Sequence, residues 1–148
     1  RYLLRSNEQE RITLKEEIAF IHSYIHLLST RFGENFRVQI DVYSGYNLYK
    51  VPPLTLQMLV ENAVKHNIIS KDEPLTLKIF TTSDQKLHVE NNLQRKTREV
   101  GSNKVGLANI MDRYKLLKQP DVEVRDTGAA FIVIVPLIKP ENHESTDN

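Results

Sequence analysis

Hydrophobic and polar residues recur along the chain with two different periods, and each change of period marks a predicted element. Between Leu14 and Phe32, apolar residues recur at steps of three and four, the spacing of one helical stripe. The preceding TLKE sequence, Thr13 to Glu16, has the form of a capping box, and Gly33 is suited to ending a helix. The pattern therefore predicts a capped, amphipathic helix over residues 14–32.

The remaining elements follow from the same two periods. Alternation predicts strands at 36–43, 75–83, 86–91, 122–125 and 131–138, and helical spacing predicts helices at 54–69 and 106–117. Runs of paired strands with a few helices favour the α+β class, with one sheet covered on one face by helices.

Three segments fall outside this regular pattern. Residues 1–12 are charged and are expected to be the end of a helix or a linker. Residues 92–104 are polar and basic, and a loop of this length within a domain is usually functional or mobile. Residues 139–148 are polar and are expected to be a disordered tail, which leaves 13–138 as the domain.

Composition narrows the function classes. A length of 148 residues fits one domain, and a net charge of +1 gives no bulk electrostatic case for a nucleic-acid partner. The absence of cysteine excludes disulfides, thiolate zinc sites and cysteine nucleophiles. No apolar run approaches the roughly 18 residues of a membrane span. Because the chain opens with RYLLRSNEQER and no Met, we expect it to be a piece of a longer protein.

The most informative stretch is LVENAVKHN, residues 59–67. Glu61, Asn62, Lys65 and His66 fall within an arc of roughly 140° on the predicted helix, beside its apolar face. One interpretation is an ordinary solvated helix face. The other is a magnesium–phosphate site, because magnesium takes few protein oxygens, lysine offers a point charge to phosphate, and a carboxylate can orient or deprotonate a reacting group.

Two weaker signals lie elsewhere in the chain. In GSNKVGLANI, a flexible segment precedes the predicted helix at Gly106, and free amides at a helix N-terminus suit an anion. No P-loop or dinucleotide-binding glycine pattern accompanies it. His22 and His26 have the i, i+4 spacing of metal ligands, but no third ligand is evident.

The order of these motifs resembles one family. The run TLKEEIAFIHSYIHLLSTRFG, then VPPLTLQMLVENAVKH, then VGLANIMDRYKLL is similar to the catalytic, ATP-binding domain of LytS-type sensor histidine kinases, over about residues 1–138. These kinases are members of the GHKL ATPase superfamily. The resemblance implies the Bergerat fold, a two-layer α/β sandwich with a mixed, mostly antiparallel sheet and helices on one face.

The resemblance also implies roles for particular residues. Asn62 matches the magnesium ligand of the family's N box, and Glu61 the residue proposed to assist catalysis. The implied ATP-binding residues are Asn62, Lys65, His66, Asn91, Lys104, Gly106, Leu107 and Asn109. Residues 92–105 match the ATP lid.

Three departures from the family pattern stand out. Asn91 occupies the position of the aspartate that reads adenine, so its carbonyl can still accept from the base but without charge. Lys104 replaces the first glycine of the second glycine box. The phosphoacceptor histidine, which lies in a motif like PHFLFN, is absent, and residues 1–10 look like the tail of the helical domain that carries it.

The implied function is that of a bacterial two-component sensor kinase. With ATP and Mg²⁺ it would transfer the γ-phosphoryl group to a histidine on an upstream helical domain, for relay to a response regulator. The expected parent protein is a homodimer anchored in the inner membrane, with this domain in the cytoplasm. The alternative is a nucleotide-sensing or protein-docking module of the same superfamily without phosphotransfer. An ATPase or serine kinase of the superfamily is a third interpretation, but the RFG and VPP segments resemble the sensor kinases specifically.

Overall fold

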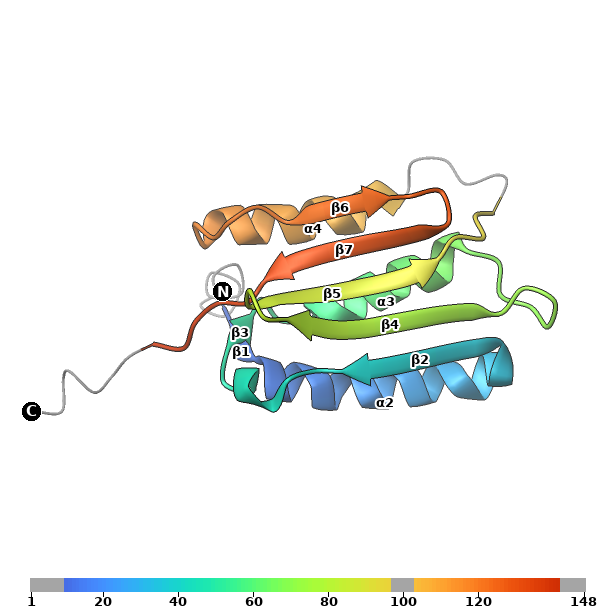
Figure 1. Ribbon diagram of the computed structural model, residues 1–148, viewed down its shortest axis with the longest axis horizontal. Coiled ribbons are helices and arrows are strands. Elements are labelled where there is room, and N and C mark those ends of the chain that lie inside the picture. Colours follow the sequence, from blue (N-terminus) through green and yellow to red (C-terminus); the bar gives the residue numbers. More distant parts are fainter. Residues whose placement is uncertain (1–9, 97–102, 142–148) are drawn as a thin grey trace, which may run out of the picture.

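The described part of the chain folds into two layers, a five-stranded sheet and three helices packed against one of its faces (Figure 1). The computed structural model describes residues 10–96 and 103–141, apart from the side chains of residues 103–105. The helices are α2 (Leu14–Phe32), α3 (Thr55–His66) and α4 (Asn103–Leu116), with short 3₁₀ turns η1 (Gly33–Asn35) and η2 (Ser44–Tyr46). The strands are β1 (Ile12–Thr13), β2 (Phe36–Asp41), β3 (Lys50–Val51), β4 (Leu75–Thr82), β5 (Lys86–Asn92), β6 (Glu123–Asp126) and β7 (Ala130–Pro136).

The main sheet has the order β2-β4-β5-β7-β6, in which only the β2–β4 pair is parallel. In Figure 1 all three helices lie behind this sheet. The core is formed where alternate strand residues meet the helices; from the sheet it includes Leu77, Ile79, Leu87, Val89, Val133 and Val135. The predicted fold class, a mixed and mostly antiparallel sheet with helices on one face, is confirmed.

Local sequence accounts for the first helix. Thr13 accepts a hydrogen bond from the N–H of Glu16, and Glu16 accepts one from the N–H of Thr13, so the predicted capping box is formed. Gly33 ends α2 with a φ of 61°, a value that favours glycine. The predicted bounds of this helix are therefore confirmed.

Other predicted boundaries need correction. Residues 1–12 do not all belong to a helix end or linker, because Ile12 begins β1, which pairs with Lys50–Val51 of β3. Helix α3 ends at His66 instead of Ile69, because Asn67 is extended and its side chain donates to the carbonyl of Ala63 at 2.9 Å. The first predicted strand ends at Asp41, two residues early, and β4 ends at Thr82.

The start of the last helix also differs from its prediction. Helix α4 begins at Asn103 instead of Gly106, so Gly106 lies within its first turns. A glycine inside a helix is tolerated at a cost of about 1 kcal/mol relative to alanine, so its presence does not force a boundary. A Cβ atom added at Gly106 would meet nothing within 4 Å.

Candidate functional site

Helix α3 carries the polar residues of the candidate site on one face and core residues on the other. Leu59, Val60 and Ala63 are buried against the sheet and the other helices. Glu61 and Lys65 are exposed, Asn62 is half-buried and His66 is buried. The helix that the apolar spacing predicted is thus formed; Glu61 and Lys65 point to solvent, whereas His66 is covered.

This polar face lines a cleft of about 840 Å³, within the size range of small-molecule sites. The lining residues are Tyr24, Leu28, Arg31, Phe32, Met58, Glu61, Asn62, Val64, Lys65, His66, Asn67, Ile68, Ile69, Lys96 and Gly106. The structure therefore brings together five of the sequence-predicted residues: Glu61, Asn62, Lys65, His66 and Gly106. These five come from α3 and from the N-terminal part of α4.

Helix α2 supplies a wall of the cleft that sequence reasoning missed. The Tyr24 hydroxyl donates to the Glu61 carboxylate at 3.4 Å, and burial, followed by the charge of Glu61, raises the pKa of Tyr24. Arg31 also lines the cleft, with its guanidinium carbon 4.7 Å from the centre of the Phe32 ring. A signal was available, since Tyr24 and Arg31 lie seven residues apart and so share one face of a predicted helix.

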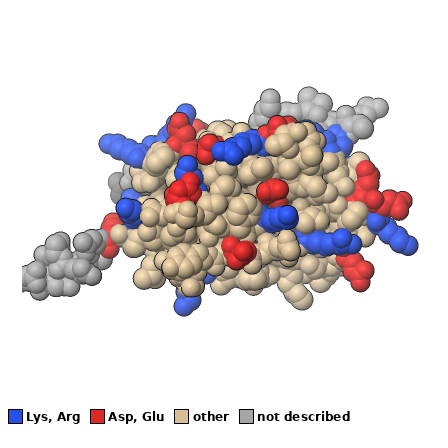
Figure 2. Space-filling view, viewed as in Figure 1, with Lys and Arg blue, Asp and Glu red and all other residues tan. Residues whose placement is uncertain are grey.

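The charges around the cleft suit a polyanion. Among the described lining residues, Arg31, Lys65 and Lys96 are cationic and Glu61 is the one acid. The open face of the sheet is different, because Figure 2 shows acidic and basic side chains interspersed there without a patch of one sign. The excess of positive charge therefore favours the cleft over the sheet face as the site for a phosphate-bearing ligand.

The donor set also fits magnesium better than a metal held by protein alone. The described residues contain no group of three or more His, Cys, Asp or Glu side chains able to hold a metal, and His22 and His26 are both exposed. Magnesium typically keeps several waters and binds substrate phosphates with one or two protein oxygens. An amide oxygen from Asn62, beside the cations of the cleft, meets that modest requirement.

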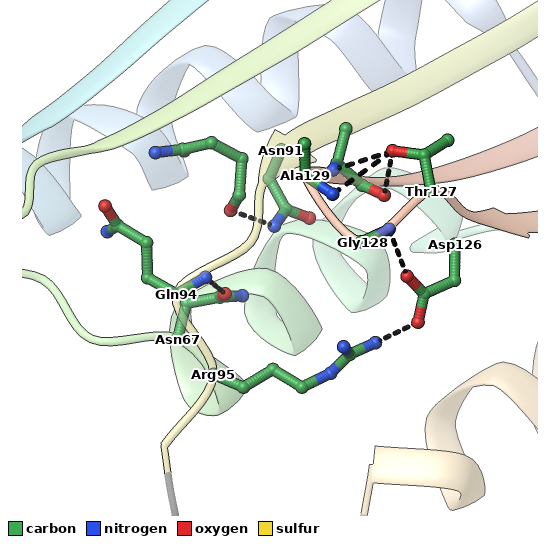
Figure 3. Close-up of polar contacts among 10 residues, drawn as sticks. Asn67, Asn91, Gln94, Arg95, Asp126, Thr127, Gly128 and Ala129 are labelled. Carbon is green, nitrogen blue, oxygen red and sulfur yellow. Dashed lines mark hydrogen bonds and ion pairs between the residues drawn. The ribbon is translucent and has the colours of Figure 1, made fainter.

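Asn91 lies apart from this cleft, on the helix-covered face of β5 in register with Leu77 and Phe131. It is buried, and its side-chain NH₂ donates to the carbonyl of Asn92 at 2.7 Å (Figure 3). With the nitrogen engaged in this way, the side-chain oxygen is the atom left to accept from a ligand. Asn91 is not among the residues lining the cleft, and its role in reading adenine stays a prediction.

A network of hydrogen bonds joins the segment after β5 to the end of α3. The N–H of Gln94 donates to the Asn67 side-chain oxygen at 2.7 Å, and its side chain donates to the carbonyls of Ile68 and Glu73, each at 2.9 Å. Arg95 forms an ion pair with Asp126, the last residue of β6 (Figure 3). Residues 93–96 of the predicted lid are therefore anchored on both sides, whereas 97–102 lie outside the described residues.

The remaining predicted contacts lie along α4. Leu107 is half-buried against the core and Asn109 is exposed; neither lines the cleft. The side chain of Lys104 lies outside the described residues. The nucleotide contacts assigned to Lys104, Leu107 and Asn109 stay predictions.

Comparisons with known proteins agree with this arrangement. A family model described as Histidine kinase matches residues 1–36. The chain is 29% identical over 129 residues to Sensor histidine kinase/phosphatase LytS of Staphylococcus aureus (strain MRSA252), a match that covers 86% of the chain. It spans 20% of that protein's length.

Solved structures share the fold. The Acinetobacter baumannii histidine kinase AdeS matches with a TM-score of 0.59 at 14% identity, over 90% of this chain and 68% of that one. The catalytic domain of histidine kinase ThkA matches with a TM-score of 0.54 at 16% identity, over 89% of this chain and 98% of that one.

Together these matches show that the chain is similar in sequence to sensor histidine kinases of the LytS type and shares its fold with the catalytic domains of histidine kinases. The resemblance to the LytS type of sensor histidine kinase is confirmed by the sequence match over most of the chain. No helix in the described part of the chain is long and apolar enough to cross a membrane.

Proposed function

We propose that residues 13–138 form the catalytic domain of a two-component sensor kinase, which binds ATP with Mg²⁺ and transfers the γ-phosphoryl group to a histidine. The observation that carries this proposal is the convergence of Glu61, Asn62, Lys65 and His66 with Gly106 around one cleft lined by three cations. A simple solvated helix face would not require that these residues share a concave site with α2 and α4.

In this proposal each cleft residue has a stated task. Lys65 attracts the phosphates as a point charge, and Asn62 offers its side-chain oxygen to magnesium. When bound near Asn62, magnesium would supply positive charge that offsets the negative charge of the phosphates. Glu61, held by the Tyr24 hydroxyl, orients the acceptor imidazole or takes its proton.

The proposed partners lie outside this chain. The acceptor histidine is on an upstream helical domain of the same parent protein, and a response regulator then receives the phosphoryl group. We propose a homodimeric parent, anchored in the inner membrane, with this domain on its cytoplasmic side. Residues 1–9 and 142–148, which include most of the expected linker and tail, lie outside the described residues.

A second candidate is a nucleotide-sensing or protein-docking module that does not transfer phosphate. It is favoured by Asn91, which is neutral where the resemblance expects an aspartate, and whose amide is already bonded to the carbonyl of Asn92. A weaker hold on adenine would limit turnover more than it would limit sensing.

Phosphotransfer in trans separates the two candidates. The domain is mixed with a helical phosphoacceptor domain and γ-labelled ATP, with Glu61→Gln as the matched variant. Label on the acceptor histidine, reduced about a hundredfold in Glu61→Gln, supports the kinase. Nucleotide binding without label supports the sensor. If ATP with Mg²⁺ fails to raise the melting temperature at millimolar concentration, the kinase and the nucleotide sensor are both wrong, and protein docking is the function left to test.

A further inference from the structure

A carboxylate is buried in the apolar face of α2. Glu17 is 1% exposed and lies between Leu14 and Ile21, the other two buried residues of this helix. Burying a carboxylate is strongly unfavourable unless hydrogen bonds or opposite charges compensate it. The groups that compensate the Glu17 carboxylate therefore indicate its structural role.

Those partners are the backbone N–H groups at the start of α3. Glu17 Oε2 accepts from the N–H of Leu56 at 2.8 Å, and Oε1 accepts from the N–H of Leu54 at 3.3 Å. Helix α3 lacks a side-chain cap of its own, because its N-cap residue is Leu54, with a φ of 67°. Glu17 thus caps α3 from a neighbouring helix, a role that a serine or aspartate at the N-cap position usually fills. Its carboxylate also lies at the positive end of the helix dipole.

Helix α4 holds the same turn from the other side. Arg113 Nη1 donates to the carbonyl of Pro53 at 2.7 Å, and its positive charge favours the ionised form of Glu17. Tyr114 is the other titratable group of α4 that faces Glu17; its buried hydroxyl has no hydrogen-bond partner within the described residues. The turn before α3 is therefore clamped between α2 and α4.

Helix α3 connects the turn held by Glu17 and Arg113 to the cleft. Glu17 contacts Leu54, and Tyr24 contacts Glu61. From the first contact to the second, the residue number increases by seven on both segments, so α2 runs parallel to α3. Seven residues are about two turns, or roughly 10 Å along the axis. A slip or rotation of α3 at its first turn therefore displaces Glu61 and Asn62 by a similar amount.

We propose that Glu17 is a positioning residue: by holding the first turn of α3, it sets the axial position and rotation of the helix that presents Glu61, Asn62 and Lys65 to the nucleotide. The effect on nucleotide binding rests on the proposed function. The structural part of the proposal, the control of α3 by a side chain of α2, stands on the contacts alone.

The test compares two neighbouring substitutions. Glu17→Gln keeps the shape but replaces one accepting oxygen with an NH₂ group that faces N–H donors. Glu16→Gln is the matched control, because Glu16 belongs to the capping box of α2 and has no hydrogen bond to α3. Both are expected to lower stability, but Glu17→Gln should weaken Mg²⁺–ATP about tenfold, whereas Glu16→Gln should stay within about twofold.

Two further readouts distinguish positioning from general destabilisation. The side-chain amide signal of Asn62 in nucleotide-free protein should shift in Glu17→Gln and not in Glu16→Gln. In the wild type, Mg²⁺–ATP affinity should fall as pH falls through the pKa of Glu17, which burial raises, and Glu17→Gln should lose that step. Glu16→Gln should keep it.

Wild-type affinity and an unshifted Asn62 signal in Glu17→Gln would overturn the proposal. If the wild type itself binds no nucleotide, the proposed function fails, and the Asn62 signal alone decides whether Glu17 controls α3. Should Glu17→Gln not fold, Glu17→Asp is measured in the same way against Glu16→Asp, because it keeps the charge but withdraws it by one methylene.

Discussion

The side-chain oxygen of Asn67 accepts a hydrogen bond from the backbone N–H of Gln94 at 2.7 Å, which ties the end of α3 to the segment after β5. The Asn67 side-chain NH₂ donates to the carbonyl of Ala63, so one buried amide serves both segments. Asn67→Ala should lower the free energy of unfolding by about 1–3 kcal/mol, because the Gln94 N–H and the Ala63 carbonyl lose their partner.

Urea unfolding followed by circular dichroism measures this loss, and hydrogen exchange at the Gln94 amide locates it. Gln39→Ala, an exposed polar position on β2, is the control and should change stability by less than about 0.5 kcal/mol. An unchanged urea midpoint in Asn67→Ala would show that the two segments are held by other contacts.

Removal of the Asn62 amide should separate magnesium binding from nucleotide binding. Asn62→Ala is expected to weaken ATP about tenfold with Mg²⁺ present and to leave binding in EDTA nearly unchanged, because the side-chain oxygen is the proposed metal ligand. Isothermal titration under both conditions gives the comparison. Gln57→Ala on the same helix, outside the cleft, controls for loss of a polar side chain. Equal affinities for wild type and Asn62→Ala would indicate that this face of α3 is an ordinary solvated surface.

Local signals predicted much of this fold, since they act over a few residues. The capping box of α2 and the polar face of α3 depend on neighbours one turn away, and both were found where the spacing placed them. The parallel pairing of β2 with β4 could not be predicted from alternation, because it joins strands separated by α3. The start of α4 was also missed, because Asn103 and Lys104 add no apolar stripe.

The candidate site shows the same limit. Glu61, Asn62, Lys65 and His66 were predicted together because one helix carries them, whereas the wall from α2 depends on a contact between Tyr24 and Glu61, 37 residues apart. Glu17 had a signal that was not used. It lies on the stripe with Leu14 and Ile21, and an acid on an apolar stripe indicates a distant partner.

Stability should depend on pH through Glu17. Burial raises its pKa in the folded protein above the unfolded value of roughly 4.3. Between those two values the folded state holds a proton that the unfolded state has lost, so the free energy of unfolding falls as pH rises through that window and levels off above it. Urea unfolding of the wild type and Glu17→Gln from pH 4 to 8 should give curves whose difference changes only in this window. Glu16→Gln should keep the wild-type slope, and parallel curves for wild type and Glu17→Gln would contradict the assignment.

The end of α4 offers a stabilising substitution. Lys118 has a φ of 56°, its N–H donates to the carbonyl of Lys115 at 2.9 Å, and the N–H of Gln119 donates to that of Tyr114 at 3.0 Å. This is the Schellman pattern, in which the residue at the position of Lys118 adopts the left-handed conformation that glycine tolerates best.

Lys118→Gly should therefore raise the free energy of unfolding by about 0.5–1 kcal/mol, the relieved strain being partly offset by the entropy of glycine in the unfolded chain. Lys118→Ala is the control, because it removes the same charge and side chain but keeps the strained φ, so it should give no gain. Thermal and urea unfolding of the three proteins measure the difference. A gain in Lys118→Ala equal to that in Lys118→Gly would assign the effect to the lysine side chain instead of the backbone.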